Sequence, residues 1–455
     1  MEPYKKSNLK IDINSTNNSL SETIIWLLMS IISLIHGLIC ITPGILSSYV
    51  TELKQEFNLS DEKFGNLGTI YGLGSLIGSM IFTIVIRRIN NKYLICGMII
   101  VNCSCNFIFF FTINYSILLF SRFLSGFASV FCFIYFPIWV ENFAMKKWVN
   151  FMQTTVQVAN TIGNIIGYFI YLILGSNKWK DGFFIESFSV LFLALIMVMI
   201  PDRYFNKNMK IKEKVEITDS KIVEMKRNEV IKIDSEESIL KDIIYNFPFI
   251  MIVLYRANRI FIFQALNFWY SDYLQNSLLE KNPKVIFWSY SITMVFSSLI
   301  GNVLGGILIN QIGGTKSKFS FIAMAILQFI SVLFGFFSPL KNSVLYFTIF
   351  MSIYILLNSA SGIISISATF AVIPDILAGP ANGLYSFVVN LIGFLPSPYF
   401  YAIMKKIFKK ESHIILLLMF YGFIGCFELV GADIYMRAKK IRLYKQKIFS
   451  FKEEN

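Results

Sequence analysis

The sequence predicts an all-α, multi-span membrane protein with twelve transmembrane helices in two pseudo-symmetric six-helix halves. Its 455 residues are 55% hydrophobic and only 15% charged, whereas a soluble domain is about 25% charged. The apolar residues gather in blocks of about 20, which is the length that crosses a bilayer as a helix. One long polar stretch, residues 201–246, separates these blocks into two groups. The blocks are continuous and do not alternate with polar residues, which argues against a β-barrel.

Each side of the polar stretch contains six apolar blocks. The predicted spans cover residues 24–50, 64–86, 93–113, 117–143, 149–174, 180–200, 247–274, 285–309, 318–338, 343–373, 382–404 and 413–436. The organisation that follows is an N-terminal tail, a first half, a charged linker, a second half and a basic C-terminal tail, with the bounds 1–23, 24–200, 201–246, 247–436 and 437–455.

The basic residues predict the orientation, because Lys and Arg concentrate in cytoplasmic loops. They occur between the second and third spans, in the linker and in the C-terminal tail. Both termini are therefore expected to be cytoplasmic, in either the plasma membrane or an internal organelle membrane. One loop disagrees, because the lysines of residues 405–410 fall on the side predicted to be outside. Basic loops also account for the net charge of +13, so no nucleic-acid partner is expected.

The two halves look like repeats of each other. The joint after the second span reads TIVIRRINNK (83–92), and the joint after the eighth span reads GILINQIGGT (306–315). Here the chain resembles the major facilitator superfamily, whose signature at these joints is roughly G-x-L-x-D-R-x-G-R-K. Gly306 and Leu308 match the second copy, whereas Arg87 stands where the first copy has an acid. The resemblance implies a carrier whose halves rock about a central site.

Within that superfamily the chain is most similar to the spinster-type branch of lysophospholipid and sphingolipid transporters. The similarity lies in LNFWYSDYL (266–274), in ANGLYSFVVNLIGFLPSPYF (381–400) and around Arg122 in SRFLSGFAS. Two acids of the branch are replaced, because Ser129 occupies one position and the other falls near Leu38. The resemblance therefore implies lipid-like substrates without supplying the carboxylates that would couple transport to protons.

Three ionisable residues inside predicted spans are the main binding candidates, because such residues are costly in a membrane and usually functional. His36 titrates in a range that suits proton coupling, or it is a structural hydrogen-bonding group. Arg122 and Arg259 suit a carboxylate or phosphate, since a guanidinium binds either in a bidentate way. The alternatives are snorkelling for Arg122, and for Arg259 a structural bond to carbonyls or to Glu428.

Amide side chains inside the spans are the second group of candidates. They are Gln157, Asn160, Gln264, Asn267, Asn358 and Asn390. In the fifth span, Gln157, Asn160 and Asn164 have the i, i+3, i+7 spacing of one helix face. They are interpreted as lining a cavity, with hydrogen bonding between helices as the alternative.

Charged residues at the cytoplasmic ends of the spans predict a gate. Glu141 is expected to pair with Arg87 or Arg88, and Asp375 with Lys316 or Lys318, so that the pairs latch the outward-facing state. The alternative is that these charges only set the topology.

No nucleophile–base constellation, phosphate-binding loop or metal-ligand spacing is present, so neither an enzyme, a metal nor another cofactor is expected. The six cysteines all fall inside apolar blocks and are interpreted as core residues.

The predicted function is secondary active or facilitative transport of a small organic solute by alternating access, with or without protons. The alternatives are a spinster-like lysophospholipid or sphingolipid transporter, and a non-transporting receptor or scaffold. The expected partners are the substrate and the lipid bilayer, and the chain is expected to be a monomer.

Overall fold

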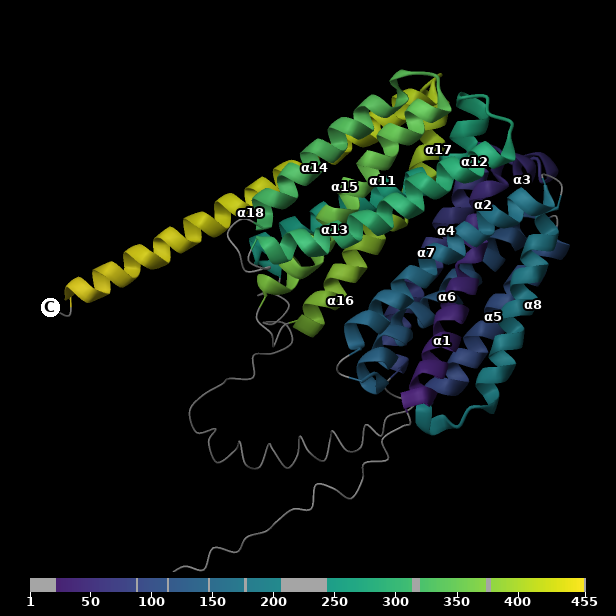
Figure 1. Cartoon of the computed structure of the whole chain (residues 1–455), viewed down its shortest axis with the longest axis horizontal. Coiled ribbons are helices and arrows are strands. Elements are labelled where there is room, and N and C mark those ends of the chain that lie inside the picture. Colours follow the sequence, from purple (N-terminus) through teal and green to yellow (C-terminus); the bar gives the residue numbers. More distant parts are fainter. Residues whose placement is uncertain are drawn as a thin grey trace, which may run out of the picture.

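The computed structural model describes residues 22–86, 89–112, 114–145, 148–175, 178–205, 244–312, 320–373 and 378–453. These residues form helices and short connections, with no β-strand among them. Figure 1 shows the helices as one elongated bundle, with the first half in purple and blue beside the second half in green and yellow. The predicted all-α class is confirmed.

The first half consists of six long helical segments. Its helices are α1 (Glu22–Ile39), α2 (Ile41–Ser48), α3 (Val50–Glu56), α4 (Asp61–Val85), α5 (Asn91–Phe111), α6 (Tyr115–Phe143), α7 (Val149–Leu174) and α8 (Trp179–Met199). The first span is divided at Cys40 into α1 and α2, and α3 extends it at its far end.

The second half repeats this plan with more interruptions. Its helices are α11 (Phe247–Asp272), α12 (Pro283–Tyr290), α13 (Ser297–Gln311), α14 (Ser320–Phe337), α15 (Val344–Ala371), α16 (Ala378–Val388), α17 (Ser397–Ile407) and α18 (Glu411–Glu453). Three π-helical turns, η2 (Tyr273–Ser277), η3 (Ser291–Phe296) and η6 (Val389–Phe394), extend or join these helices within the seventh, eighth and eleventh spans.

The helical segments coincide with the twelve predicted spans to within a few residues, except that α18 continues to Glu453, well past the predicted end of the last span at residue 436. Ten stretches within the described residues are long and apolar enough to cross a membrane. The two remaining predicted spans correspond to α4, which is outside that set, and to α7, whose apolar part is Val158–Leu174. Ten membrane-spanning helices are therefore established by length and composition, and the prediction of twelve is consistent with them.

Several helices begin at polar caps that the sequence places just before an apolar block. The side chains of Ser60, Asn90, Asn114, Asn282 and Ser343 each accept a hydrogen bond from a backbone N–H in the first turn that follows. Such bonds satisfy donors that a helix start leaves unpaired. They explain why these helices begin within a few residues of the predicted boundaries.

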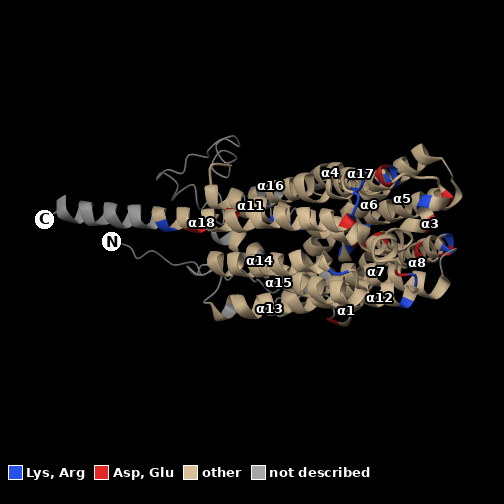
Figure 2. Ribbon diagram, turned by 90° about the horizontal axis from the view of Figure 1, so that it is seen from above, with Lys and Arg blue, Asp and Glu red and all other residues tan. Residues whose placement is uncertain are grey.

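The two halves touch mainly at one end of the bundle. We call the end where α8 finishes and α11 begins the linker end, and the opposite end the distal end. At the distal end α4 packs against α17, and α11 packs against α2 and α3. Toward the linker end the two halves diverge (Figure 1). Figure 2 shows that charged residues gather toward the distal end, near α3 and α17.

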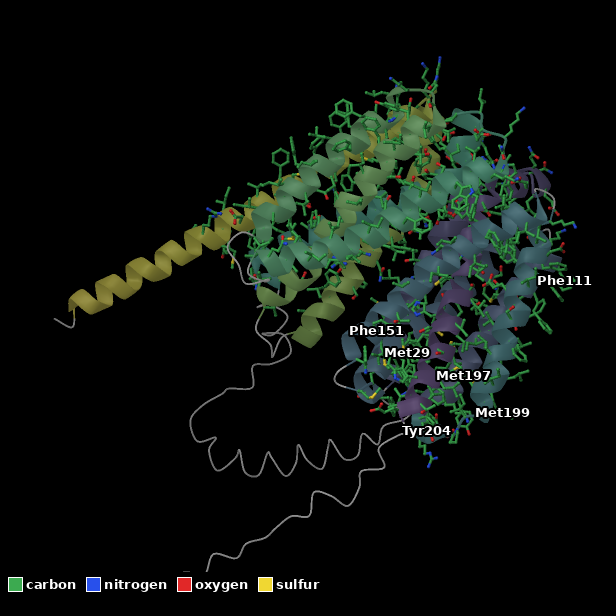
Figure 3. The ribbon with its side chains drawn as sticks, in the orientation of Figure 1. Met29, Phe111, Phe151, Met197, Met199 and Tyr204 are labelled. Atoms are coloured by element: carbon green, nitrogen blue, oxygen red, sulfur yellow. The ribbon has the colours of Figure 1, made fainter. Side chains whose placement is uncertain are left out.

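At the linker end of the first half, the chain that leaves α8 folds back under α6. Residues Asp202–Tyr204 form a short 3₁₀ helix, and Figure 3 shows Tyr204 close to the lower ends of the helices that carry Met29 and Met197. The hydroxyl of Tyr135 donates to the carbonyl of Phe205 at 2.6 Å. The described start of the predicted linker is thus anchored on the first half, and residues 206–243 of it lie outside the described residues.

Candidate functional site

Arg259 lies on α11. Because an α-helix rises about 1.5 Å per residue, Arg259 is about 18 Å from the linker end of that helix. Its Nη1 donates to the carbonyl oxygen of Asn358 on α15 at 2.7 Å. Its Nε is buried and has no hydrogen-bond partner among the described residues. The structural bond to a carbonyl is therefore present, and the bond to Glu428 is not formed. Part of the guanidinium remains available to a ligand.

Gly362 on α15 makes room for this guanidinium. A Cβ atom at Gly362 would lie 1.9 Å from Nη1 of Arg259, which is far inside van der Waals contact. Tyr354, also on α15, is fully buried, and its hydroxyl has no partner among the described residues. We call Arg256, Arg259, Tyr354, Asn358 and Gly362 the arginine site.

Arg256 lies one turn earlier on α11 and is 8% exposed. Its guanidinium carbon is 4.8 Å from the centre of the Tyr385 ring on α16. Its Nε and Nη1 have no hydrogen-bond partner among the described residues. An aromatic face attracts a cation but satisfies none of its N–H donors, so Arg256 also retains unused donors.

The first half also buries an arginine, Arg122 on α6. It is 3% exposed, and its guanidinium carbon lies 4.7 Å from the centre of the Tyr71 ring on α4. Its Nε and Nη1 lack a partner among the described residues. Because it is buried under Tyr71, Arg122 does not snorkel to the surface. No ion pair formed by the described residues includes Arg122, Arg256 or Arg259.

Glu186, which is fully buried on α8, was not among the residues predicted from the sequence. The hydroxyl of Thr42 lies 2.6 and 2.5 Å from its two carboxyl oxygens. Asn106 on α5 donates to Oε1 of Glu186 at 3.3 Å. The signal was available, because Glu186 is an acid inside the apolar block FFIESFSVLF.

His36 lies on α1 and is 3% exposed. Its ring centre is 4.8 Å from that of Phe133 and 5.7 Å from that of Phe136, both on α6. Its Nδ1 is buried and has no partner among the described residues. The structure therefore places His36 in an aromatic contact between α1 and α6, and not beside Arg122 or Arg259.

The predicted amides do not form one cluster. Asn164 donates to the Asn160 side chain within α7, and Tyr290 donates to Asn267 at 2.8 Å. Asn358 is buried beside Arg259, whereas Gln264 and Asn390 are half-buried. The side chain of Gln157 lies outside the described residues.

The predicted cytoplasmic gate cannot be followed in the structure. Arg87, Arg88, Lys316, Lys318 and Asp375 lie outside the described residues, as does the side chain of Glu141.

A different group of charges joins the halves at the distal end. We call Lys54, Asp61, Asp272, Lys405 and Glu411 the distal charge cluster. Asp272 of the second half is fully buried, and one of its oxygens lies 2.7 Å from Lys54 of the first half. Lys54 also lies 2.7 Å from Asp61, and Lys405 pairs with Asp272, Glu411 and Asp61.

Two lysines of residues 405–410, the loop that disagreed with the predicted topology, pair with carboxylates at the interface between the halves. Lys405 is 9% exposed and paired with three carboxylates, and Lys406 lies 2.6 Å from Glu62 of the first half. These lysines serve as partners across the interface between the halves. Burial alone would raise the pKa of Asp61, but the charges of Lys405 and Lys54 outweigh it and hold that pKa below its usual range.

Aromatic and polar contacts complete the closure of the distal end. The rings of Tyr168 on α7 and Tyr290 on α12 stack with their centres 3.6 Å apart. The hydroxyl of Thr51 in α3 donates to Oε1 of Gln275 in η2.

The model of the Major Facilitator Superfamily matches residues 25–397. A cis,cis-muconate transport protein of Acinetobacter baylyi is 21% identical over 314 residues, which cover 66% of this chain and 70% of the relative. A probable metabolite transport protein of Saccharomyces cerevisiae is 27% identical over 149 residues, which cover 32% of this chain. That alignment spans only 30% of the yeast protein's own length.

Solved structures of similar fold cover nearly the whole chain. A bacterial homologue of the human lysosomal transporter Spinster, in an inward-facing and unoccupied conformation, has a TM-score of 0.67 at 13% identity. The match covers 92% of this chain and 96% of that one. The nucleoside transporter NupG has a TM-score of 0.66 at 12% identity and covers 89% of this chain and 98% of its own. At these identities the likeness establishes the fold.

Proposed function

This chain belongs to the Major Facilitator Superfamily, and from that premise we propose that it transports a small organic anion across a membrane by alternating access. The observation that carries the proposal is the state of Arg122, Arg256 and Arg259. Each guanidinium lies on a helix that is long and apolar enough to cross a membrane, and each has at least one N–H nitrogen without a hydrogen-bond partner among the described residues. A charge in that position is costly unless it is paired, and a carboxylate is the bidentate partner that suits it.

The position of the halves supports a carrier that loads from the linker end. The distal end is closed by the distal charge cluster and by the Tyr168–Tyr290 stack. With the linker in the cytoplasm, as the basic residues predict, this is an inward-facing conformation. Arg259 in the second half is the primary anchor for the anion, and Arg122 presents a guanidinium from the first half.

One relative's name supports the chemical class, since cis,cis-muconate is a dicarboxylate. It is therefore the first probe, followed by monocarboxylates, nucleosides, zwitterions, neutral sugars and lysophospholipids. The measurement is thermal unfolding of the purified full-length protein with each compound. A ligand that binds only the folded state at a hundredfold excess over Kd stabilises it by about 2.7 kcal/mol.

Two substitutions at the arginine site show whether a stabilising compound binds there. Arg259→Ala removes the charged donor, which contributes about 1.5–3 kcal/mol and so about tenfold to a hundredfold in Kd. Gly362→Ala places a methyl group against Nη1 of Arg259. It is expected to weaken binding of the compound and also to lower the stability of the protein. Gly306→Ala is the matched control, because no described atom lies within 4 Å of its new Cβ.

The outcomes separate the candidate functions. Stabilisation by carboxylates that is lost in Arg259→Ala and Gly362→Ala supports an anion carrier. Stabilisation by lysophospholipids alone would contradict the anion proposal and favour the spinster-like alternative. An absence of stabilisation by every compound in the panel would favour a non-transporting receptor or scaffold.

A further inference from the structure

Glu186 is a buried carboxyl group outside the arginine site. It is 0% exposed and lies on α8, within a helix that crosses the membrane. The neutral side chains of Thr42 and Asn106 form hydrogen bonds with its carboxyl group. No ammonium or guanidinium among the described residues is within ion-pair distance of it.

We propose that Glu186 is a proton-binding site of this carrier, and that its proton is linked to the charge at Arg122, so that the anion and a proton are carried together. The proposal rests on the proposed transport of an anion. The cost of burying an ionised carboxylate without an ion-pair partner is several kcal/mol, so the surroundings of Glu186 favour its neutral, protonated form. One hydroxyl and one amide are the neutral partners that such a carboxylic acid can use.

Arg122 is the cation that can change this balance. It interacts electrostatically with Glu186 without forming an ion pair with it. Asn106 on α5 donates a hydrogen bond to Glu186. Asn102 lies one turn earlier on α5 and donates to the hydroxyl of Ser125 at 3.0 Å. Ser125 lies one turn after Arg122 on α6. Tyr71, which covers Arg122, forms a 2.7 Å hydrogen bond with Ser129. The carboxyl and the guanidinium thus belong to one polar region inside the first half.

The other titratable groups around Glu186 are neutral side chains. Cys40 at the junction of α1 and α2, Cys103 on α5 and Tyr71 on α4 lie within its electrostatic range. Helix α1 also packs on α8, and its titratable side chain His36 lies against Phe133 and Phe136. Tyr168 and Tyr171 of α7 interact with Tyr290 and Glu52. Among the described residues, Arg122 is thus the positive charge that acts on this carboxyl.

The coupling follows from Coulomb's law and from linkage. An anion bound at Arg122 cancels the positive charge that favours ionised Glu186, so anion binding promotes proton binding. By reciprocity, a proton on Glu186 strengthens anion binding by the same factor. When the anion leaves Arg122, the uncovered guanidinium promotes release of the proton to water on that side. The direction of this linkage is that of a symporter.

The first test needs no substrate. Infrared spectra of the full-length protein in lipid are recorded from acidic to alkaline pH, and the carboxylic-acid carbonyl band lost in Glu186→Gln is assigned to Glu186. In Arg122→Gln this group is expected to keep its proton to higher pH than in the unsubstituted protein. Arg122→Lys is the matched control, because it retains the charge and should change the titration little.

Two infrared outcomes would overturn the proposal. One is that no protonated carboxyl band disappears in Glu186→Gln. The other is that Arg122→Gln titrates like the unsubstituted protein. If Arg122→Gln does not fold, Thr42→Val replaces it. That change removes a hydroxyl placed to donate to an ionised carboxylate, so Glu186 should again keep its proton to higher pH.

The second test measures the coupling itself with cis,cis-muconate, or with the strongest anion of the panel. The Kd in the unsubstituted protein is expected to change about tenfold across the titration of Glu186, within the usual range of coupling between two sites. In Glu186→Gln that pH dependence should disappear. A pH dependence that persists in Glu186→Gln would overturn the coupling. Failure of every anion to bind would refute the proposed function, whereas the infrared titration still decides whether Glu186 and Arg122 are linked.

Discussion

Asp272 and Arg122 show two different ways in which this chain buries a charge. Asp272 is fully buried, and Lys54 and Lys405 both lie against its carboxylate. Arg122 is buried against an aromatic ring, and two of its nitrogens have no partner among the described residues. The first arrangement is complete within the protein and stabilises one conformation. The second is incomplete and is therefore suited to a ligand.

Asp272→Asn is expected to weaken the closure of the distal end. The substitution removes the acceptor that Lys54 and Lys405 share across the two halves. Both lysines keep partners in Asp61 and Glu411, so the expected loss is about 1–3 kcal/mol, within the range for a charged hydrogen bond. Thermal unfolding in detergent measures this loss. Thiol labelling of a cysteine placed at Gln275 should become faster, because that residue lies at the closed end.

Lys406→Ala is the control for Asp272→Asn. Lys406 is 61% exposed, and its partner Glu62 is 29% exposed, so this surface pair should contribute less than about 1 kcal/mol. Equal effects of the two substitutions on stability and labelling would show that the buried carboxylate has no special part in the closure.

Single residues were predictable where one side chain is unusual in its own surroundings. Arg122 and Arg259 were identified because a positive charge inside an apolar block is costly wherever it points. Glu186 is detectable by the same rule. The distal charge cluster was not predictable, because its members come from distant parts of the chain. In the sequence Lys405 has the pattern of a residue that sets topology, because its partners Asp61 and Asp272 are far from it along the chain.

At the scale of elements, α4 is the helix by which the first half approaches the second. Gly65, Gly68 and Gly72 recur at the spacing of one helix face. Added Cβ atoms there would lie 2.9 Å from Ala402, 2.8 Å from Phe268 and 3.0 Å from Phe394. Small residues permit this close packing of helices in a membrane, so the face of α4 is fitted to α17 and its neighbours.

Gly65→Val is expected to separate α4 from α17 and to favour opening of the distal end. The first added carbon would already lie 2.9 Å from both the Ala402 Cβ and the Pro398 carbonyl oxygen. Overpacking of this kind costs about 1–3 kcal/mol, and here the halves can relieve it by moving apart. The same cysteine at Gln275 should react faster in this variant.

The matched control is Gly97→Val on α5, because no described atom lies within 4 Å of a Cβ at that position. It makes the same change of residue in the same half, away from the interface. If both variants label at the same rate, the glycine face of α4 does not control closure.

The lengths of the elements were predictable, but their internal breaks were not. An apolar block of about 20 residues indicates a span whether or not its helix is continuous. The break at Cys40 and the π-helical turns at Tyr273, Ser291 and Val389 leave composition unchanged. Their positions depend on packing between helices that are distant in sequence.

At the scale of the whole molecule, the two halves are joined at one end and diverge at the other (Figure 1). Transport by alternating access requires the joined end to open. The repeat in the sequence predicts two such halves, but it is equally consistent with either end being closed. The choice between the two states depends on small free-energy differences between interfaces, and these arise only once side chains from both halves meet.

Holding the distal end closed should therefore permit binding and stop transport. Thr51 and Gln275 are hydrogen-bonded across the halves, so cysteines at both positions can be joined by a short bis-methanethiosulfonate reagent. The joined protein should still bind cis,cis-muconate or the best anion of the panel, because the linker end remains accessible. Uptake into proteoliposomes should fall to background and return when the bridge is reduced.

The control bridge joins cysteines at Glu56 and Lys180, which form a 2.8 Å ion pair within the first half at the same end. Both positions are 42% exposed, whereas five of the six native cysteines are buried, so the reagent should react mainly at the introduced pairs. This bridge does not connect the halves and should leave uptake nearly unchanged. If the Thr51–Gln275 bridge leaves uptake intact while the bridge is verified by mass, the distal end need not open for transport. The contacts between the halves at the distal end would then persist throughout transport, and the substrate would have to pass by another route.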